Sequence, residues 1–384
     1  MSVLNALVIS VPELLFSNNS DSLFDRCLSL LVKRCKEREE NVRLAIFDSF
    51  TKFLNVLLRV KVSMEGKKSM TKLIPNVLKS CGKYVRDDPG KYLKTKESCF
   101  NVFREVLNIL GVSALKSHLD FLFPLIVSSL DVKKQGVNSG PLRLVSLEFL
   151  RQILTEFNVS VTLKYLSLVV DPLMNSMSDE WYRIVAESLR TASAFVEVMS
   201  SDAKMIAQFV KPLFAAIRPC MRKKDLDQEI KECAISAASL IIAKAGSSLD
   251  DDVLDHSLHL FVRRLKSDIT RMAALRAFTE IAKSRTVDLS QVVGDVVTIL
   301  STFLKSQNRK LKILSLETLI HLVETNIPQK KFNEISAAAD LINDSDLHVA
   351  QLATVLARNI LMSDPNSKMI EKQFVPQIQR IVSS

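Results

Sequence analysis

Apolar residues recur along the chain at helical spacing, with polar turns between the runs. In residues 225–241, Ile230, Ala234, Ala237 and Ile241 lie at offsets 0, 4, 7 and 11, which is the spacing of one face of an α-helix. An aspartate ahead of the first turn can accept a hydrogen bond from an unpaired backbone N–H, so it favours a helix start. The pattern therefore predicts a helix whose narrow face of small side chains lets a second helix approach closely.

The same arrangement recurs as a motif: a β-branched, aliphatic or aromatic residue, then a basic residue, then a small residue three positions after the basic one. Two of the eight copies depart from it, because Ile46 is not small and Ala350 is not basic. The basic position falls at Arg43, Lys96, Arg143, Arg183, Lys231, Arg271, Lys312 and Ala350. These positions are 38 to 53 residues apart, and a period of about 40 to 47 residues built from helix pairs is typical of HEAT and armadillo repeats. The sequence predicts an all-α fold, an α-solenoid (superhelix) of about eight HEAT-type helix pairs.

The repeats divide the chain into three parts. Residues 1–20 are interpreted as a partial helix of a preceding repeat, since no basic residue precedes their apolar run as in a signal peptide. Residues 21–362 form the HEAT-repeat solenoid, and residues 363–384 are the start of a truncated further repeat. A repeat contacts only its neighbours, so one array can continue at this length, and it needs a polar cap at its end. Because no such cap is evident, we expect the chain to be a segment of a longer protein or a truncated product.

Proline and glycine mark the remaining local structure. First helices of several pairs carry a proline within an apolar run, at Pro75, Pro124, Pro172, Pro212 and Pro376. A proline removes a helical hydrogen bond and bends or interrupts the helix, which suits a curved stack. Residues 131–140 are expected to form a loop, followed by Pro141 at a first helical position.

The composition excludes several classes of protein. Only 8 of 384 residues are glycine, and 47% are hydrophobic without an apolar run near the roughly 20 residues that a membrane span requires. The six cysteines form no Cys-x-x-Cys pair, which is typical of a reducing compartment. His256 and His259 are the nearest histidine pair and lack a third ligand, so we interpret them as structural or surface residues.

No catalytic motif is present in the sequence. It contains no Gly-x-Ser-x-Gly, no phosphate-binding glycine loop and no His-Glu-x-x-His. We therefore expect no enzyme activity, no catalytic residue, no cofactor, no bound metal and no small-molecule substrate. A protein-binding scaffold, a transport receptor and a nucleic-acid-binding solenoid remain as alternatives.

Positive charge is concentrated in one region. Residues 59–104 hold twelve basic and four acidic side chains, a net charge of +8 within a chain of net charge +10. Such a patch attracts an acidic partner, while the alternative is a solvated outer face. Nucleic acid is unlikely as the partner, because the region has few aromatic residues for base stacking and no glycine-lysine nest. The candidate partner-binding residues in it are Lys67, Lys68, Lys79 and Lys83.

Turns that lead into second helices provide three further candidate contacts, at Trp181, Asp268 and Arg309. Packing between repeats is the alternative role for Trp181, the only tryptophan. The basic residues of the motif are interpreted as structural, because arginine or lysine there can pair with an acid of the neighbouring repeat. They include Arg183, Lys231, Arg271 and Lys312.

Four stretches of the sequence are similar to one family. Residues 36–42, 225–236, 264–271 and 345–351 resemble, in order and spacing, the middle repeats of the cullin-associated and neddylation-dissociated proteins. The resemblance extends from about residue 22 to 362. None of these stretches is a catalytic motif, and four in register are more specific than a generic repeat signature.

The resemblance implies a function that composition and periodicity do not show. Members of this family are long HEAT solenoids that wrap around a cullin and its RING subunit when the cullin lacks its ubiquitin-like modifier, and they promote exchange of substrate-receptor modules. We therefore expect a non-enzymatic scaffold that binds unmodified cullin-RING and regulates assembly of cullin-RING ubiquitin ligases, in the cytoplasm and nucleus. A nuclear transport receptor-like or other protein-binding HEAT scaffold is the alternative. The second helices are expected to build a concave surface for an elongated helical partner, and no membrane is involved. The chain is shorter than these proteins and lacks both of their ends, so binding to the central body of the cullin is the expected part of their activity.

Overall fold

The structure is a computed structural model in which the chain is helical and, over the residues described, contains no β-strand. It describes residues 6, 10, 23–59, 64–86, 90–222, 227–325 and 329–383. The partial helix predicted at residues 1–20 lies almost wholly outside them. None of the described helices is long and apolar enough to cross a bilayer.

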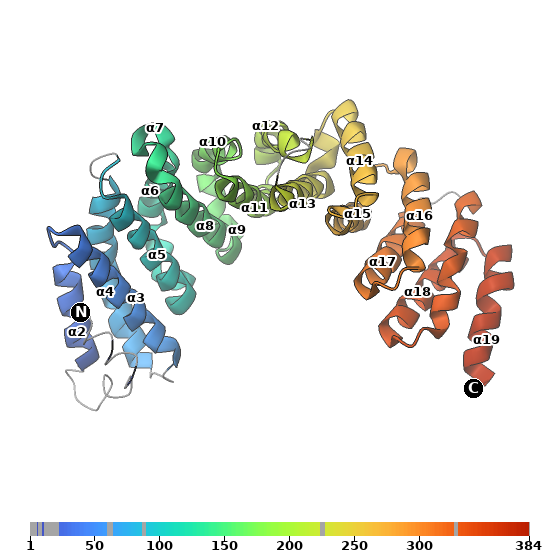
Figure 1. Cartoon of the computed structure of the whole chain (residues 1–384), viewed down its shortest axis with the longest axis horizontal. Helices are drawn as coiled ribbons and strands as arrows, with labels where there is room; N and C mark the ends of the chain where they lie inside the picture. The colour runs from blue at the N-terminus through green and yellow to red at the C-terminus, as the bar shows by residue number, and fades with distance from the viewer. Residues whose placement is uncertain are drawn as a thin grey trace. The chain divides into compact units, whose positions relative to one another are not determined.

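The chain divides into two compact units, Met1–Val198 and Met199–Ser384, a division that the repeat pattern does not predict. Figure 1 shows the helices of each unit arranged in pairs. The prediction of an all-α solenoid of HEAT-type helix pairs is confirmed.

The first unit contains four helix pairs in its described part. The first helix of each pair packs on the first helix of the next, and the second helices stack in the same way, so that the unit has two layers. The pairs are α2 (Leu23–Arg34) with α3 (Glu40–Arg59), α4 (Met64–Arg86) with α5 (Leu93–Leu110), α6 (Leu119–Leu130) with α8 (Gly140–Glu156), and α10 (Leu166–Ser176) with α11 (Tyr182–Met199). Single-turn helices α7 (Val132–Gln135) and α9 (Val159–Thr162) lie between these elements.

The second unit repeats the same two layers over its described residues. Its pairs are α12 (Ala203–Arg222) with α13 (Gln228–Ala245), α14 (Asp251–Leu265) with α15 (Arg271–Ser284), and α16 (Ser290–Leu304) with α17 (Arg309–Thr325). In the last pair, α18 (Leu347–Ser363) packs on the 3₁₀ segments Gln329–Ala338 and Asp340–Asn343, and the chain then continues through Ile370–Phe374 into α19 (Val375–Ser383). A 3₁₀ stretch takes the place of an α-helix there, which the repeat pattern does not predict.

Large apolar side chains join successive repeats within a unit. In the first unit, the rings of Phe100 and Phe103 on α5 lie 6.0 and 5.8 Å from the ring of Phe149 on α8. All three side chains are fully buried. The Phe100–Phe149 contact is edge-to-face and the Phe103–Phe149 contact is tilted. Aromatic contacts add to the stabilisation from burial of apolar area, so the core is continuous from one repeat to the next.

Local signals in the sequence place several helix ends correctly. The Asp227 carboxylate accepts a hydrogen bond of 2.8 Å from the backbone N–H of Glu229 and so caps α13, as the sequence predicts. Pro141 lies in the first turn of α8, where its missing N–H costs no hydrogen bond.

The prediction of a loop at residues 131–140 is wrong in part. Asp131 accepts hydrogen bonds from the backbone N–H groups of Lys133 and Lys134 and thereby starts the one-turn helix α7. Gly136, at φ 82°, ends that helix in a left-handed conformation that favours glycine. The segment is therefore a capped turn of helix followed by a 3₁₀ turn.

Candidate partner-binding surfaces

In three of the four motif copies of the first unit, at Arg43, Lys96 and Arg143, the basic residue joins one repeat to the next. Arg183 instead lies over the rings of Trp181 and Tyr182 in its own turn. Arg143 at the start of α8 forms an ion pair with Asp179 in the turn before α11, and only 6% and 11% of these two side chains are exposed. Lys96 on α5 is fully buried, with its Nζ 3.0 Å from Oε1 of Gln135 in α7. These cations hold neighbouring repeats in register.

Arg43 takes the same place in the first repeat. Its guanidinium donates hydrogen bonds to the carbonyls of Glu37 and Arg38 at 2.9 and 2.5 Å. It also lies 5.0 and 4.8 Å from the ring centroids of Tyr84 and Tyr92 in the following repeat. Cation–π contact thus replaces the ion pair at this junction.

In the second unit, Lys312 and Arg271 occupy the motif position. Lys312 lies 3.2 Å from the carboxylate of Asp344 in the next repeat, as the interpretation of these cations as structural predicts. The backbone N–H of Asp346, together with Lys312, lowers the pKa of Asp344. Arg271 differs, because its ion pair at 2.6 Å is with Asp268 of its own turn, and its guanidinium contacts the next repeat through the ring of Phe303, at 5.0 Å from the ring centroid.

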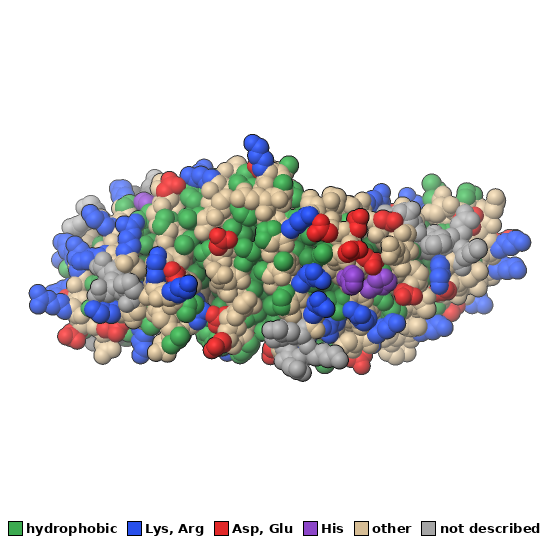
Figure 2. Space-filling model, turned by 90° about the horizontal axis from the view of Figure 1, so that it is seen from above, with side chains coloured by type: hydrophobic (Ala, Val, Ile, Leu, Met, Phe, Trp, Pro, Cys, Tyr) green, Lys and Arg blue, Asp and Glu red, His purple; other side chains and the backbone are tan. Residues whose placement is uncertain are grey.

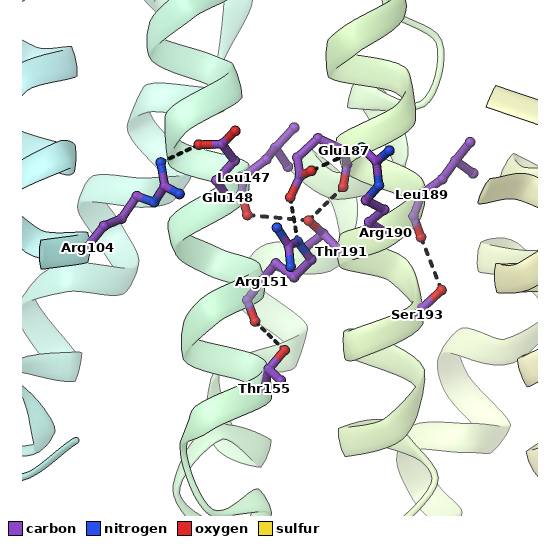
Figure 3. A network of polar contacts seen from close by, with 10 residues as sticks. All are labelled: Arg104, Leu147, Glu148, Arg151, Thr155, Glu187, Leu189, Arg190, Thr191 and Ser193. Atoms are coloured by element: carbon purple, nitrogen blue, oxygen red, sulfur yellow. Dashed lines mark hydrogen bonds and ion pairs between the residues drawn. The ribbon is translucent and has the colours of Figure 1, made fainter. Parts of the chain in front are cut away.

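A row of charged side chains crosses the second helices of the first unit (Figure 3). Arg104 on α5 pairs with Glu148 on α8, and Arg151 on α8 lies 2.6 Å from Glu187 on α11. Arg190 approaches the other oxygen of Glu187 at 3.4 Å. We call these five residues the charge ladder. All of its side chains except Glu187 are between 28% and 40% exposed, so the ladder offers an ordered, half-exposed polar surface.

The charge ladder was not predicted from the sequence, although a signal for it exists. Arg104 and Glu148 are 44 residues apart, and Arg151 and Glu187 are 36 apart, close to the repeat period. A search for opposite charges one repeat apart on second helices could have found both pairs.

Replacement of Glu187 by alanine should destabilise the first unit by about 1–2 kcal/mol. The Glu187 carboxylate is only 5% exposed, and its loss leaves Arg151 and Arg190 without their shared partner. Urea denaturation followed by circular dichroism would measure the change. Glu187→Gln keeps one side-chain oxygen as a hydrogen-bond acceptor, so it should lower the free energy of unfolding by less. An equal loss of stability in both variants would show that hydrogen bonds to the Glu187 oxygens do not stabilise this contact.

Each of the predicted turn contacts already has partners within its own unit. The Trp181 ring is half-buried beside Gly140, where an added Cβ would lie 3.0 Å from its Cε3, so it packs between repeats. Asp268 is exposed and paired with Arg271. Arg309 is exposed and paired with Asp346, whose pKa is lowered chiefly by the hydrogen bond from Arg309. Within the second unit, no contact between Asp268 and Arg309 is seen among the described residues.

Two of the predicted lysines do lie together. Lys79 and Lys83 on α4 line a cleft of about 780 Å³ between α2 and α4, next to Phe121 of α6. Lys33, Lys36 and Arg86 also line it, and we call these five cations and their surroundings the basic cleft. The side chains of Lys67 and Lys68 lie outside the described residues.

The histidine pair and the buried Cys35 have structural surroundings in the described part of the chain. His256 lies 2.6 Å from the carbonyl of Asp252, and His259 lies 3.6 Å from the carboxylate of Asp255. Among the described residues, no group of three or more histidine, cysteine or acidic side chains could hold a metal ion. Burial raises the pKa of Cys35 to about 12, which keeps this thiol protonated at neutral pH.

Comparison with known folds supports the repeat architecture. An engineered protein of known crystal structure superposes with a TM-score of 0.54 over 93% of this chain and 94% of its own, at 13% identity. A designed armadillo repeat protein, solved in complex with a peptide, superposes with a TM-score of 0.50 over 62% of this chain and 99% of its own, at 15% identity. At such low identity the likeness shows the fold alone.

Comparison of sequences is more specific. Residues 113–238 match the family model described as "CAND1-like, TPR repeats". The chain is 32% identical to Cullin-associated NEDD8-dissociated protein 1 of Drosophila melanogaster over 97% of its length, and 29% identical to the protein of that name from Arabidopsis thaliana over 99%. It covers 31% and 32% of these two proteins, so it spans about a third of the length of the curated relatives it matches. The resemblance inferred from the sequence is thus confirmed, and the chain is a HEAT-repeat protein similar, over nearly its whole length, to part of the cullin-associated NEDD8-dissociated proteins.

Proposed function

We propose that the chain is a non-enzymatic scaffold that binds a cullin with its RING subunit, in the form that lacks the ubiquitin-like modifier, and that it does so in the cytoplasm and nucleus. The observation that carries the proposal is the similarity over 97% of the chain to a protein named for its association with cullins. Through this binding the chain would regulate assembly of cullin-RING ubiquitin ligases. The chain spans about a third of the length of its relatives. Binding of a cullin therefore does not by itself imply that the chain exchanges substrate receptors, and the two activities need separate tests.

The charge ladder is the surface of the first unit that suits this role. It crosses three consecutive second helices, and its ion pairs fix the side chains in place before a partner arrives. Preorganised side chains lose less conformational entropy on binding. A row of alternating charges can also recognise a complementary row on an elongated helical partner.

Immobilised chain should capture purified unmodified cullin-RING complex and capture the modified complex poorly. The double variant Arg104→Glu/Glu148→Arg sharpens this test, because it keeps the ion pair while it inverts the charge presented to a partner. We expect this variant to remain folded and to bind the cullin about tenfold more weakly. Titration by biolayer interferometry would give both affinities.

Two outcomes would contradict the proposal. Equal capture of modified and unmodified cullin would show that the chain does not select the unmodified form. Absence of capture by the folded chain would show that the cullin-RING complex is not its partner. A small GTPase in its GTP form, added to the same assay, tests the alternative of a transport receptor. Binding of that GTPase without binding of the cullin would favour the alternative.

A further inference from the structure

We infer that the basic cleft of the first unit binds a small polyanion with clustered phosphate groups. The five cations of the cleft are Lys33, Lys36, Lys79, Lys83 and Arg86, and no acidic side chain lines it among the described residues. Figure 2 shows lysine and arginine side chains gathered at the N-terminal end of this unit. This site does not depend on the proposed binding of a cullin.

The four lysines of the cleft are exposed, lie close together and have no acidic partner in the described part of the chain. Among the residues that the structure describes, no carboxylate lies within ion-pair distance of Lys33, Lys36, Lys79 or Lys83. By contrast, Lys52 lies 2.5 Å from the carboxylate of its neighbour on the same helix. Lysines with no partner, grouped in one cleft, repel one another, and a bound anion would relieve that repulsion.

The helix ends at the cleft neutralise only part of this charge. Helices α2 and α4 both end there, since the cleft includes residues of their last turns. Each helix C-terminus contributes about half a negative charge, so among the described groups about four of the five positive charges remain uncompensated. A phosphate group carries about −1.5 to −2 at neutral pH, so two or three phosphates would balance the cleft. A carboxylate carries a single negative charge, so four carboxylates would be needed to balance the same positive charge. A ligand with four carboxylates is bulkier than one with two or three phosphates.

One wall of the cleft is fixed in place. The Phe121 ring packs directly on Gly82, where an added Cβ would lie 2.1 Å from Cζ of the ring. The guanidinium of Arg86 lies 4.5 Å from the centroid of the same ring, and this cation–π contact orients it. An oriented arginine can bind phosphate oxygens with two N–H groups at once.

The dimensions of the cleft decide between ligand classes. Its volume of about 780 Å³ lies within the range of about 300–1,000 Å³ typical of small-molecule sites. The tip of the Phe121 ring packs on Gly82, and Arg86 covers one face of that ring at 4.5 Å from its centroid, so this face is not open to stack a nucleic-acid base. A compact phosphate-bearing molecule therefore fits better than a nucleic acid.

Isothermal titration of the whole chain with sodium tripolyphosphate tests the inference. We expect saturable binding that weakens as salt is added, and binding of citrate, a multivalent carboxylate, that is at least about tenfold weaker. The variant Lys79→Gln/Lys83→Gln should lose at least about tenfold in affinity for tripolyphosphate. The matched control Lys52→Gln, on α3 and outside the cleft, should bind as the unchanged chain does.

A second arm distinguishes a soluble ligand from a lipid headgroup. Phosphatidylcholine vesicles that contain phosphatidylinositol bisphosphate should co-sediment with the chain if the source is a membrane, and should leave it in solution if the source is a soluble polyphosphate. Failure of the folded chain to bind either probe would overturn the inference. Equal affinity for citrate, or binding unaffected by Lys79→Gln/Lys83→Gln, would overturn it as well. Capture of a cullin is measured separately, so failure of one proposal leaves the other standing.

Discussion

Replacement of Asp179 by alanine should lower the free energy of unfolding of the first unit by about 3–5 kcal/mol. The side chains of Arg143 and Asp179 are 6% and 11% exposed, so removal of the carboxylate leaves a buried guanidinium without its counter-charge. The Arg143 Nε already has no hydrogen-bond partner, which makes the ion pair its main compensation. The Asp179 carboxylate also accepts a hydrogen bond of 2.9 Å from the backbone N–H of Trp181, so the turn into α11 loses its anchor. Because Trp181 is the only tryptophan, its fluorescence during urea denaturation reports unfolding at this turn.

An exposed ion pair in the same unit is the matched control. Asp48 lies 2.5 Å from Lys52 one turn along α3, and both side chains are at least a third exposed. Asp48→Ala should therefore cost at most about 0.5 kcal/mol. The double variant Arg143→Met/Asp179→Leu should recover most of the loss, since an apolar pair leaves no buried charge. If Asp179→Ala costs no more than Asp48→Ala, the claim that this junction depends on a buried ion pair is wrong.

The fold follows from local features of the sequence where those features act within a repeat. The spacing of apolar residues, the aspartate that caps α13 and Pro141 at the start of α8 all act over a few residues, so they can be recognised without a structure. The one-turn helix after Asp131 also has a local cause, but its glycines and polar residues are equally typical of a loop. The 3₁₀ segment at residues 329–338 and the division into two units have no comparable local signal.

The candidate surfaces were harder to predict, because they depend on the register between repeats. Arg143 belongs to a recognisable motif, but its partner Asp179 lies 36 residues away, in a turn that the motif does not include. The local concentration of positive charge predicts Lys79 and Lys83, whereas Lys33 and Lys36 join them through the packing of α2 on α4. Asp268 and Arg309, predicted from their place in turns that lead into second helices, are exposed and form ion pairs with charges nearby. Whether Trp181, Asp268 or Arg309 contacts a partner stays a prediction.

Truncation of Phe149 to alanine should destabilise the first unit by about 3–5 kcal/mol. Its ring is fully buried on α8 and contacts Phe100 and Phe103 of the preceding repeat, so its loss opens a cavity at the junction between two repeats. Each repeat of a solenoid contacts mainly its neighbours, and the damage should therefore be local. Native-state hydrogen exchange should show faster exchange of amides in α5 and α8 and unchanged exchange in α15 and α17 of the other unit.

The control for this variant is Leu168→Ala on α10, whose side chain is 43% exposed and should cost no more than about 0.5 kcal/mol. Phe149→Leu, which keeps most of the buried volume, should fall between the two alanine variants. Equal acceleration of exchange in both units would show that the chain unfolds as a single cooperative body, against the local coupling that separate cores imply. No change in stability for Phe149→Ala would mean that α5 and α8 move together and close the cavity. The packing between second helices would then be less rigid than the full burial of its aromatic residues indicates.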